Sequence, residues 1–230
     1  MRILVITSCT GRKKHKSPNQ LNYEDFASPE RLHRRTAELK DFKVPAAEMY
    51  TGQQHQHLMA GLKEVRKVYG LAVIDLHILS AGYGLLSEDD VIVPYNVTFS
   101  GLNKSDLLAR SNRLQLHKHV ETLIADYDLI FFLLGEKYVQ ALQLPLEVPD
   151  TVTQIFLLGT GYKRLIPDSP NVHFVPAGSD LARELGVMGV ALKGFVFKLL
   201  CEVVRRDGLQ VFEKVRQNPQ LIPKIALANR

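Results

Sequence analysis

The run Arg2-Ile3-Leu4-Val5-Ile6-Thr7, residues 2–7, decides the fold that we expect for this chain. A continuous apolar run of this length predicts a short strand whose two faces are both buried. Strands of that kind lie inside parallel sheets, where helices cover both faces. Residues 2–7 therefore predict an interior strand of a mostly parallel sheet.

Further apolar runs and helical patterns alternate along the rest of the chain. This alternation is typical of a layered, Rossmann-like α/β fold with a mostly parallel central sheet flanked by helices, and we expect one such domain over residues 1–230. Within it, residues 17–44 are polar and predict an insertion or lid, and residues 188–230 predict a helical C-terminal segment. The predicted strands are residues 72–80, 128–134, 154–158 and 172–175. The predicted helices are residues 55–69, 104–126 with Ser105 as N-cap, 138–142, a helix from about Leu181 capped by Ser179-Asp180, 188–206 and 210–217.

Composition narrows the cellular setting. The chain has 230 residues, of which 46% are hydrophobic, and a formal net charge of +5. No stretch is apolar for the length of a bilayer span, and Cys9 and Cys201 are too few to suggest a disulfide framework. We therefore expect a cytoplasmic protein that does not engage a membrane, and the sequence indicates no cofactor.

A loop suited to anion binding follows the first strand. Small residues allow backbone amides to approach an anion, and cations add attraction. We therefore predict that this loop binds a phosphate group, so that replacing its two lysines by alanine weakens binding of nucleotides or short DNA. The alternative is that the cations only solubilise a mobile loop. The small residues are Ser8, Cys9, Thr10 and Gly11, and the cations are Arg12, Lys13 and Lys14.

The stretch from Ser80 to Tyr95 is the most specific in the chain. Glycines on either side of Tyr83 predict a tight turn that presents the tyrosine ring, and Asp89 and Tyr95 follow within reach of the same rim. The alternative is a turn whose aromatic rings simply pack. As a functional site, this stretch makes Tyr83 and Asp89 candidate catalytic residues. Its candidate ligand-binding residues are Ser80, Gly82, Gly84 and Tyr95.

Two sequence elements carry a resemblance to known proteins. Residues 79–101, with Leu-Ser-Ala-Gly-Tyr-Gly-Leu-Leu and a later Pro-Tyr, resemble the signature of YaaA-like proteins of the peroxide stress response. The pairing of this signature with Ser-Cys-x-x-x-Lys-Lys at 8–14 and Ala-x-x-x-Tyr-Thr at 46–51 is more similar to a group of uncharacterised bacterial and phage proteins. The resemblance implies DNA binding and protection from oxidative damage. A more distant similarity leads to domains of enzymes that modify 7-deazaguanine bases. The residues that the resemblance marks are Ser8, Cys9, Lys13, Lys14, Tyr50, Ser80, Tyr83, Gly84, Pro94 and Tyr95.

Other strand ends complete the predicted site. Gly135 and Glu136 follow a very apolar strand, and Glu136 could act as a base or hold a ribose hydroxyl, or simply favour a helix N-terminus. Cys9 could act as a nucleophile beside the cations. Two histidine pairs, His55 with His57 and His117 with His119, have members two residues apart. On a helix the two members would face apart, so the pairs predict no metal site. We expect a shared cleft lined by Ser8, Tyr50, Ser80, Tyr83 and Glu136.

Two functions fit these features. The first is an enzyme that acts on a nucleotide, a nucleoside or a base in nucleic acid, with phosphate on the basic loop and Tyr83 or Tyr95 stacked on the base. The second is a non-enzymatic protein that binds DNA or protects it under stress. Cations around a deep pocket would favour the first, and a broad exposed basic stripe would favour the second. The sequence leaves the oligomeric state open.

Overall fold

A six-stranded sheet forms the centre of the computed structural model, which describes residues 1–230. Its strand order is β4-β3-β1-β6-β7-β8, and every pair except β3–β4 is parallel. The predicted mostly parallel α/β sheet is thus confirmed, with the strand of residues 2–7 in its interior. The strands are β1 Ile3–Ser8, β3 Ile74–Ser80, β4 Gly84–Ser87, β6 Leu129–Leu133, β7 Thr153–Leu158 and β8 Val172–Pro176.

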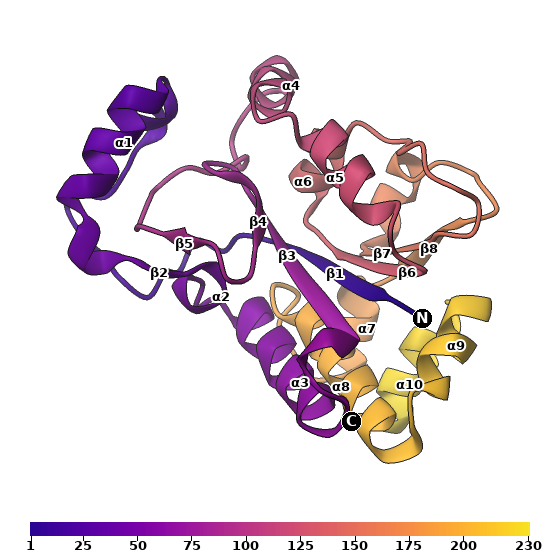
Figure 1. Ribbon diagram of the computed structural model, residues 1–230. Coiled ribbons are helices and arrows are strands. Elements are labelled where there is room, and N and C mark those ends of the chain that lie inside the picture. Colours follow the sequence, from indigo (N-terminus) through magenta and orange to yellow (C-terminus); the bar gives the residue numbers. More distant parts are fainter.

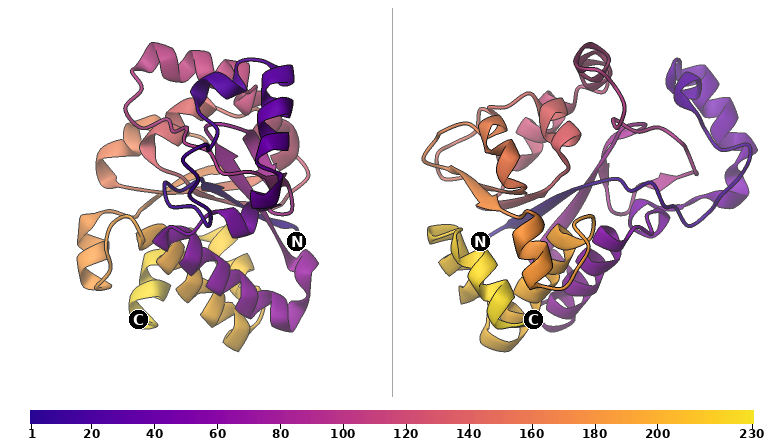
Figure 2. Two further views of the ribbon diagram at one scale, coloured as in Figure 1. Left: turned by 90° about the vertical axis from the view of Figure 1, so that its left-hand side faces the viewer. Right: turned by 180° about the vertical axis from the view of Figure 1, so that it is seen from behind.

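Two helical layers cover the sheet (Figures 1 and 2). Side chains alternate along β1, so Leu4 and Ile6 enter one core while Ile3 and Val5 enter the other. This two-sided burial explains why β1 is apolar throughout. The first core contains α4 Lys104–Arg113, α5 Leu116–Ile124 and α6 Glu136–Leu142. The second contains α3 Gln53–Tyr69, α7 Ser179–Glu184, α8 Leu192–Asp207, α9 Gln210–Gln217 and α10 Leu221–Ala228.

The order of the parallel strands creates a topological switch point. From β1 the chain goes to β3 on one side, and it later returns to β6 on the other side of β1. Helix α3, which follows β1, and helix α6, which follows β6, pack on opposite faces of the sheet. In open α/β sheets a crevice forms at this point, outside the carboxyl ends of the strands.

The predicted insertion at residues 17–44 contains more regular structure than expected. Helix α1, Pro29–Glu38, starts where Ser28 accepts a hydrogen bond from the Arg31 amide and Pro29 occupies the first turn. It has no fully buried residue, and Figure 1 shows it projecting at the edge of the molecule. Helix α1 contains few apolar residues, which is why its polar sequence suggested an irregular segment. The short elements around it are η1 Tyr23–Phe26, η2 Lys40–Phe42, β2 Val44–Pro45 paired with β5 Val91–Ile92, and α2 Ala46–Met49.

Several predicted helices have different boundaries in the structure. The single helix expected over residues 104–126 is wrong, because the chain breaks at Gln115, whose φ of 49° is left-handed. The N-cap is Asn103, whose side chain accepts from the Asp106 amide at 2.9 Å, and Ser105 lies inside the helix.

In the C-terminal part, the helix boundaries also differ from the predicted ones. Helix α7 starts at Ser179 after Gly178, so Ser179-Asp180 are helical residues. Helix α8 starts at Leu192, four residues later than expected, and α10 lies within the predicted helical C-terminal segment but was not predicted as a separate helix. Short 3-10 turns complete the chain at η3 Leu71–Val73, which delays β3, and at η4 Thr160–Leu165. No helix combines the length and apolar character that a membrane crossing requires.

Candidate functional site

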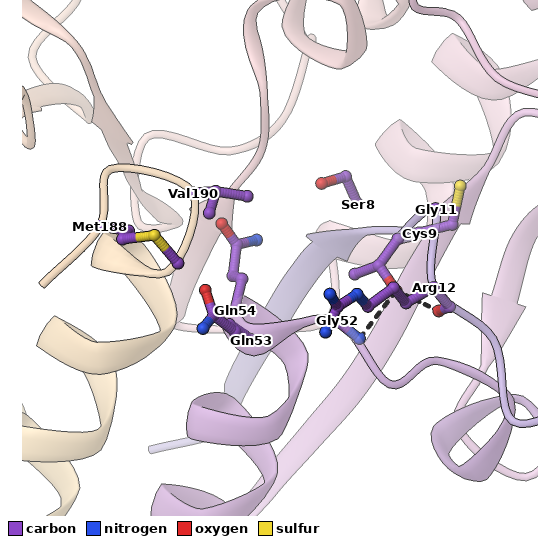
Figure 3. Close-up of a pocket in the computed structure, with 10 residues that line it drawn as sticks. Ser8, Cys9, Gly11, Arg12, Gly52, Gln53, Gln54, Met188 and Val190 are labelled. Carbon is purple, nitrogen blue, oxygen red and sulfur yellow. Dashed lines mark hydrogen bonds between the residues drawn. The ribbon is translucent and has the colours of Figure 1, made fainter.

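A pocket of about 510 Å³ opens beside the switch point (Figure 3). Three segments that are distant in sequence surround it: the loop after β1, the N-terminus of α3 and the loop that precedes α8. Its volume lies within the range of small-molecule sites. The lining residues are Ser8, Cys9, Thr10, Gly11, Arg12, Gly52, Gln53, Gln54, Met188 and Val190.

One wall of the pocket offers hydrogen-bond donors. Helix α3 has no side-chain cap, and no backbone group accepts from the amides of Gln53 and Gln54. The loop after β1 is held against this helix end, because the Thr10 hydroxyl accepts from the Gly52 amide at 3.2 Å and donates to the Arg12 carbonyl at 2.8 Å. A glycine is needed at position 52, since a Cβ there would lie 2.7 Å from the Cβ of Thr10.

The opposite wall is apolar. Met188 and Val190 are 59% and 67% exposed, unusual values for such side chains, and both line the pocket. No acidic residue is among the lining residues. The pocket therefore combines a wall with unpaired amides and an arginine with a wall of exposed apolar side chains.

Gln54 connects the two strands at the switch point. Its side-chain amide donates to the Thr7 hydroxyl of β1 at 3.1 Å and to the Leu133 carbonyl of β6 at 2.8 Å. This residue holds the N-terminus of α3 over the carboxyl ends of both strands. Nothing in the sequence marks Gln54 as part of a site, because a glutamine in the first turn of a helix is ordinary.

The tyrosines of the two sequence motifs, Tyr50, Tyr83 and Tyr95, pack together as a cluster in the interior and do not line the pocket. The Tyr50 and Tyr95 hydroxyls are 2.8 Å apart, and Ser80 donates to the Tyr95 hydroxyl at 2.8 Å. Tyr83 packs edge to face on Tyr95, and its amide donates to Ser80. Burial raises the pKa of the Tyr50, Tyr83 and Tyr95 hydroxyls, so they stay neutral. Tyr95 is only 1% exposed, so its ring is not free to stack on a base, contrary to our expectation.

Cys9 lies between the pocket and this cluster. Its Sγ is 2.9 Å from the Tyr138 hydroxyl, and Figure 3 shows it pointing away from Gln54. A second, smaller pocket of about 240 Å³ is lined by Cys9, Tyr138 and Lys13 among others. The Lys13 ammonium lies 4.3 Å from the centre of the Tyr95 ring, and burial lowers its pKa.

The other predicted site residues take different positions. Lys14 forms an exposed ion pair with Glu48 at 2.7 Å and lines neither pocket. Glu136, in the first turn of α6 after Gly135, accepts from Gln140. Asp89 is exposed at the other end of β3, because the chain reverses at the turn before Gly84 and runs back along β4. The structure thus brings Tyr50, Ser80, Tyr83 and Tyr95 together and places Ser8 to Gly11 at the pocket.

No group of three or more potential metal ligands occurs in the structure. His55, one of the paired histidines, is buried and its Nε2 lies 2.7 Å from the Ala47 carbonyl oxygen.

The environments of the two cysteines predict different reactivities. Cys9 is partly exposed and lines both pockets, whereas Cys201 is fully buried, and burial raises the pKa of its thiol. We expect one thiol per native chain to react with a small aromatic disulfide reagent, and two after unfolding. Thiol counting on the protein and on Cys9→Ser checks this. Rapid reaction of the native Cys9→Ser protein would contradict it.

Fold and site together define a doubly wound α/β protein with a pocket beside its switch point, lined by the N-terminus of α3 and the loop after β1. Comparison with known proteins identifies the family of the chain. It belongs to the family described as "Family of unknown function (DUF6884)", whose model matches residues 35–164. No curated protein matches this sequence. The matched range contains the tyrosine cluster and the N-terminus of α3, and it excludes the loop after β1 and the loop before α8.

Proposed function

We propose that this protein binds a nucleotide-like small molecule that carries a phosphate, in the pocket at the carboxyl ends of β1 and β6. The observation that carries the proposal is the composition of that pocket. The free amides of α3 and the Arg12 side chain face a space with an apolar wall and no acidic residue. A phosphate ester attached to a flat apolar base matches both walls.

The orientation of the ligand follows from the two walls. Unpaired amides and the positive end of the helix dipole at the start of α3 favour the phosphate. Arg12 adds a charge-assisted contact from the loop after β1. Met188 and Val190 are left for the base, in place of the tyrosines that the sequence suggested, which are buried or half-buried.

The distant similarity to domains of enzymes that modify 7-deazaguanine bases supports a ligand that contains a nucleobase, and the site favours only part of the chemistry first considered. Among the candidate catalytic side chains, Cys9 alone lines the pocket, whereas Glu136 and Asp89 do not. Carboxylate-assisted cleavage of a glycosyl bond therefore has no support from this geometry. An enzymatic role rests on the thiol of Cys9, with the Tyr138 hydroxyl beside it.

Binding of nucleic acid without catalysis is the second candidate, and the placement of the cations weighs against it. Arg31 and Arg35 form ion pairs with Asp25, and Lys14 pairs with Glu48. Cations that are already paired contribute little to a continuous phosphate-binding stripe. The pocket, in which Arg12 is the one cation among the lining residues, favours a small molecule as the ligand of the proposal.

Arg12→Ala tests the proposal against a matched control. We expect the affinity for adenosine or guanosine monophosphate to fall about tenfold, because one charge-assisted hydrogen bond is lost. Lys14→Ala removes a cation two residues away that faces Glu48, and we expect it to leave affinity unchanged. Calorimetry on the three proteins, with a short single-stranded DNA as competitor, measures both effects.

The outcomes separate the candidates. An equal loss in both variants, together with tighter binding of the DNA than of the mononucleotide, would favour the nucleic-acid function. Absence of mononucleotide binding by the unaltered protein would refute the proposed function.

A further inference from the structure

Lys193 lies next to residues that line the same pocket, although it is not itself one of them. It lies in the first turn of α8, three residues after Val190, which lines the pocket. Its Nζ donates to the Leu134 carbonyl, directly after β6. The register that pairs Thr7 with Leu133 puts Leu134 beside Ser8, another lining residue. Adjacent strands are about 4.8 Å apart, so the amine is close to the pocket.

Other contacts confirm that this part of α8 faces the site. Gln54, which also lines the pocket, donates to the Leu133 carbonyl, one residue before the acceptor of Lys193. Gly194 lies so close to α3 that a Cβ there would be 2.0 Å from the Gln54 carbonyl oxygen. Lys193 and Gln54 therefore extend from two helices in contact to the same strand end.

The ammonium of Lys193 has no anionic partner in the protein. None of the ion pairs includes it, and burial, the only cause of the shift, lowers its pKa to about 8. The titratable groups on the surrounding elements are engaged elsewhere. Cys9 contacts Tyr138, Glu136 accepts from Gln140, and His57 packs on Phe195. A largely buried cation without a counter-ion is unfavourable, and a bound anion would remove that cost.

We propose that Lys193 pairs with the phosphate of the bound ligand, as a second cation of the site in addition to Arg12. This inference rests on the proposed function and extends it to a phosphate monoester with two negative charges. A different role, in which Lys193 only caps the Leu134 carbonyl, makes other predictions for stability and for pH dependence.

The experiment measures binding of adenosine monophosphate by calorimetry between pH 7 and 9.5, where the phosphate ester is mostly dianionic, and binding of inorganic phosphate at one fixed pH, because inorganic phosphate itself titrates near pH 7. The variants are Lys193→Met, which keeps the length of the side chain, and Lys193→Arg, which keeps its charge. Lys198→Met on the same helix is the control, because Lys198 pairs with Glu202. Thermal unfolding of each variant shows whether it folds.

For the unaltered protein, we expect affinity to fall as pH rises through about 8, since the amine is charged below its pKa and neutral above it. Lys193→Met should bind about tenfold more weakly at pH 7 and show no fall with pH, with thermal stability retained or increased. Lys193→Arg should bind at every pH without the fall, because arginine does not titrate in this range. Lys198→Met should behave like the unaltered protein.

Three results would overturn the inference. If Lys193→Met keeps the affinity and the pH dependence, Lys193 does not contact the anion while the proposed function stands. If Lys193→Met is markedly less stable and Lys193→Arg does not restore binding, Lys193 is a structural cap. If the unaltered protein binds neither probe, the proposed function fails, and the role of Lys193 fails with it.

Discussion

Replacing Gly194 by alanine should be one of the most damaging single changes in this protein. Helices α3 and α8 touch at this position, and a Cβ would lie 2.0 Å from the Gln54 carbonyl oxygen and 2.8 Å from its carbon. Both are backbone atoms within a helix, so no rotation of a side chain relieves the overlap. We expect Gly194→Ala to lower the free energy of unfolding by about 3 kcal/mol, the upper range for overpacking. For a chain of this size the melting temperature would fall by about 6–12 °C.

Gly161→Ala is the matched control for this prediction. A Cβ at Gly161 meets no atom within 4 Å, and its backbone is not left-handed. We expect it to melt within about 2 °C of the unaltered protein. The outcome for Gly194→Ala bears on function as well, because the carbonyl it displaces belongs to a residue that lines the pocket. Equal melting temperatures for the two variants would show that the helices separate at little cost.

The sheet was predictable because a strand that is buried on two faces requires a continuous run of apolar residues in the sequence. Residues 2–7 and 128–134 are almost continuously apolar, and both became interior strands with side chains in two cores. Helices that bury only a narrow stripe, or none, left weaker marks. α1 has no fully buried residue, and the break at Gln115 depends on a single left-handed residue in an otherwise continuous pattern. Such features come from local backbone geometry, which periodicity does not report.

The candidate site was predictable only for the segment that follows β1. Residues after an interior strand must lie at the carboxyl edge, and Ser8 to Gly11 do line the pocket there. Gln54, Met188 and Lys193 come from the starts of two helices and a loop, where nothing in the sequence marks a position as facing a particular strand end. The prediction that the tyrosines line the cleft was wrong for a different reason. Their motif is distinctive, but its hydroxyls bond to one another in the interior.

That buried cluster gives the other prediction with a large expected effect, at Ser80. Its hydroxyl donates to Tyr95 at 2.8 Å and accepts from the amides of Gly82 and Tyr83 at 3.2 and 3.0 Å. Ser80→Ala removes one of the two hydrogen-bond partners of the buried Tyr95 hydroxyl, which keeps Tyr50, and it removes the acceptor of two turn amides. Each unsatisfied buried group costs about 1–3 kcal/mol, so we expect a loss of about 3 kcal/mol in the free energy of unfolding.

Tyr50→Phe distinguishes this explanation from a general sensitivity of the core. It removes a hydroxyl whose partner is Tyr95 alone, and Tyr95 keeps its bond from Ser80. We expect a loss of only about 1 kcal/mol, measured for both variants by denaturant unfolding with a common slope. Ser87→Ala, on the neighbouring strand β4, should be nearly neutral, because Ser87 is only partly buried and its hydroxyl makes no hydrogen bond. If Ser80→Ala were no more destabilising than Tyr50→Phe, the turn between β3 and β4 would not depend on Ser80. The distinctive sequence from Ser80 to Tyr95 would then have a role other than stabilising its own turn.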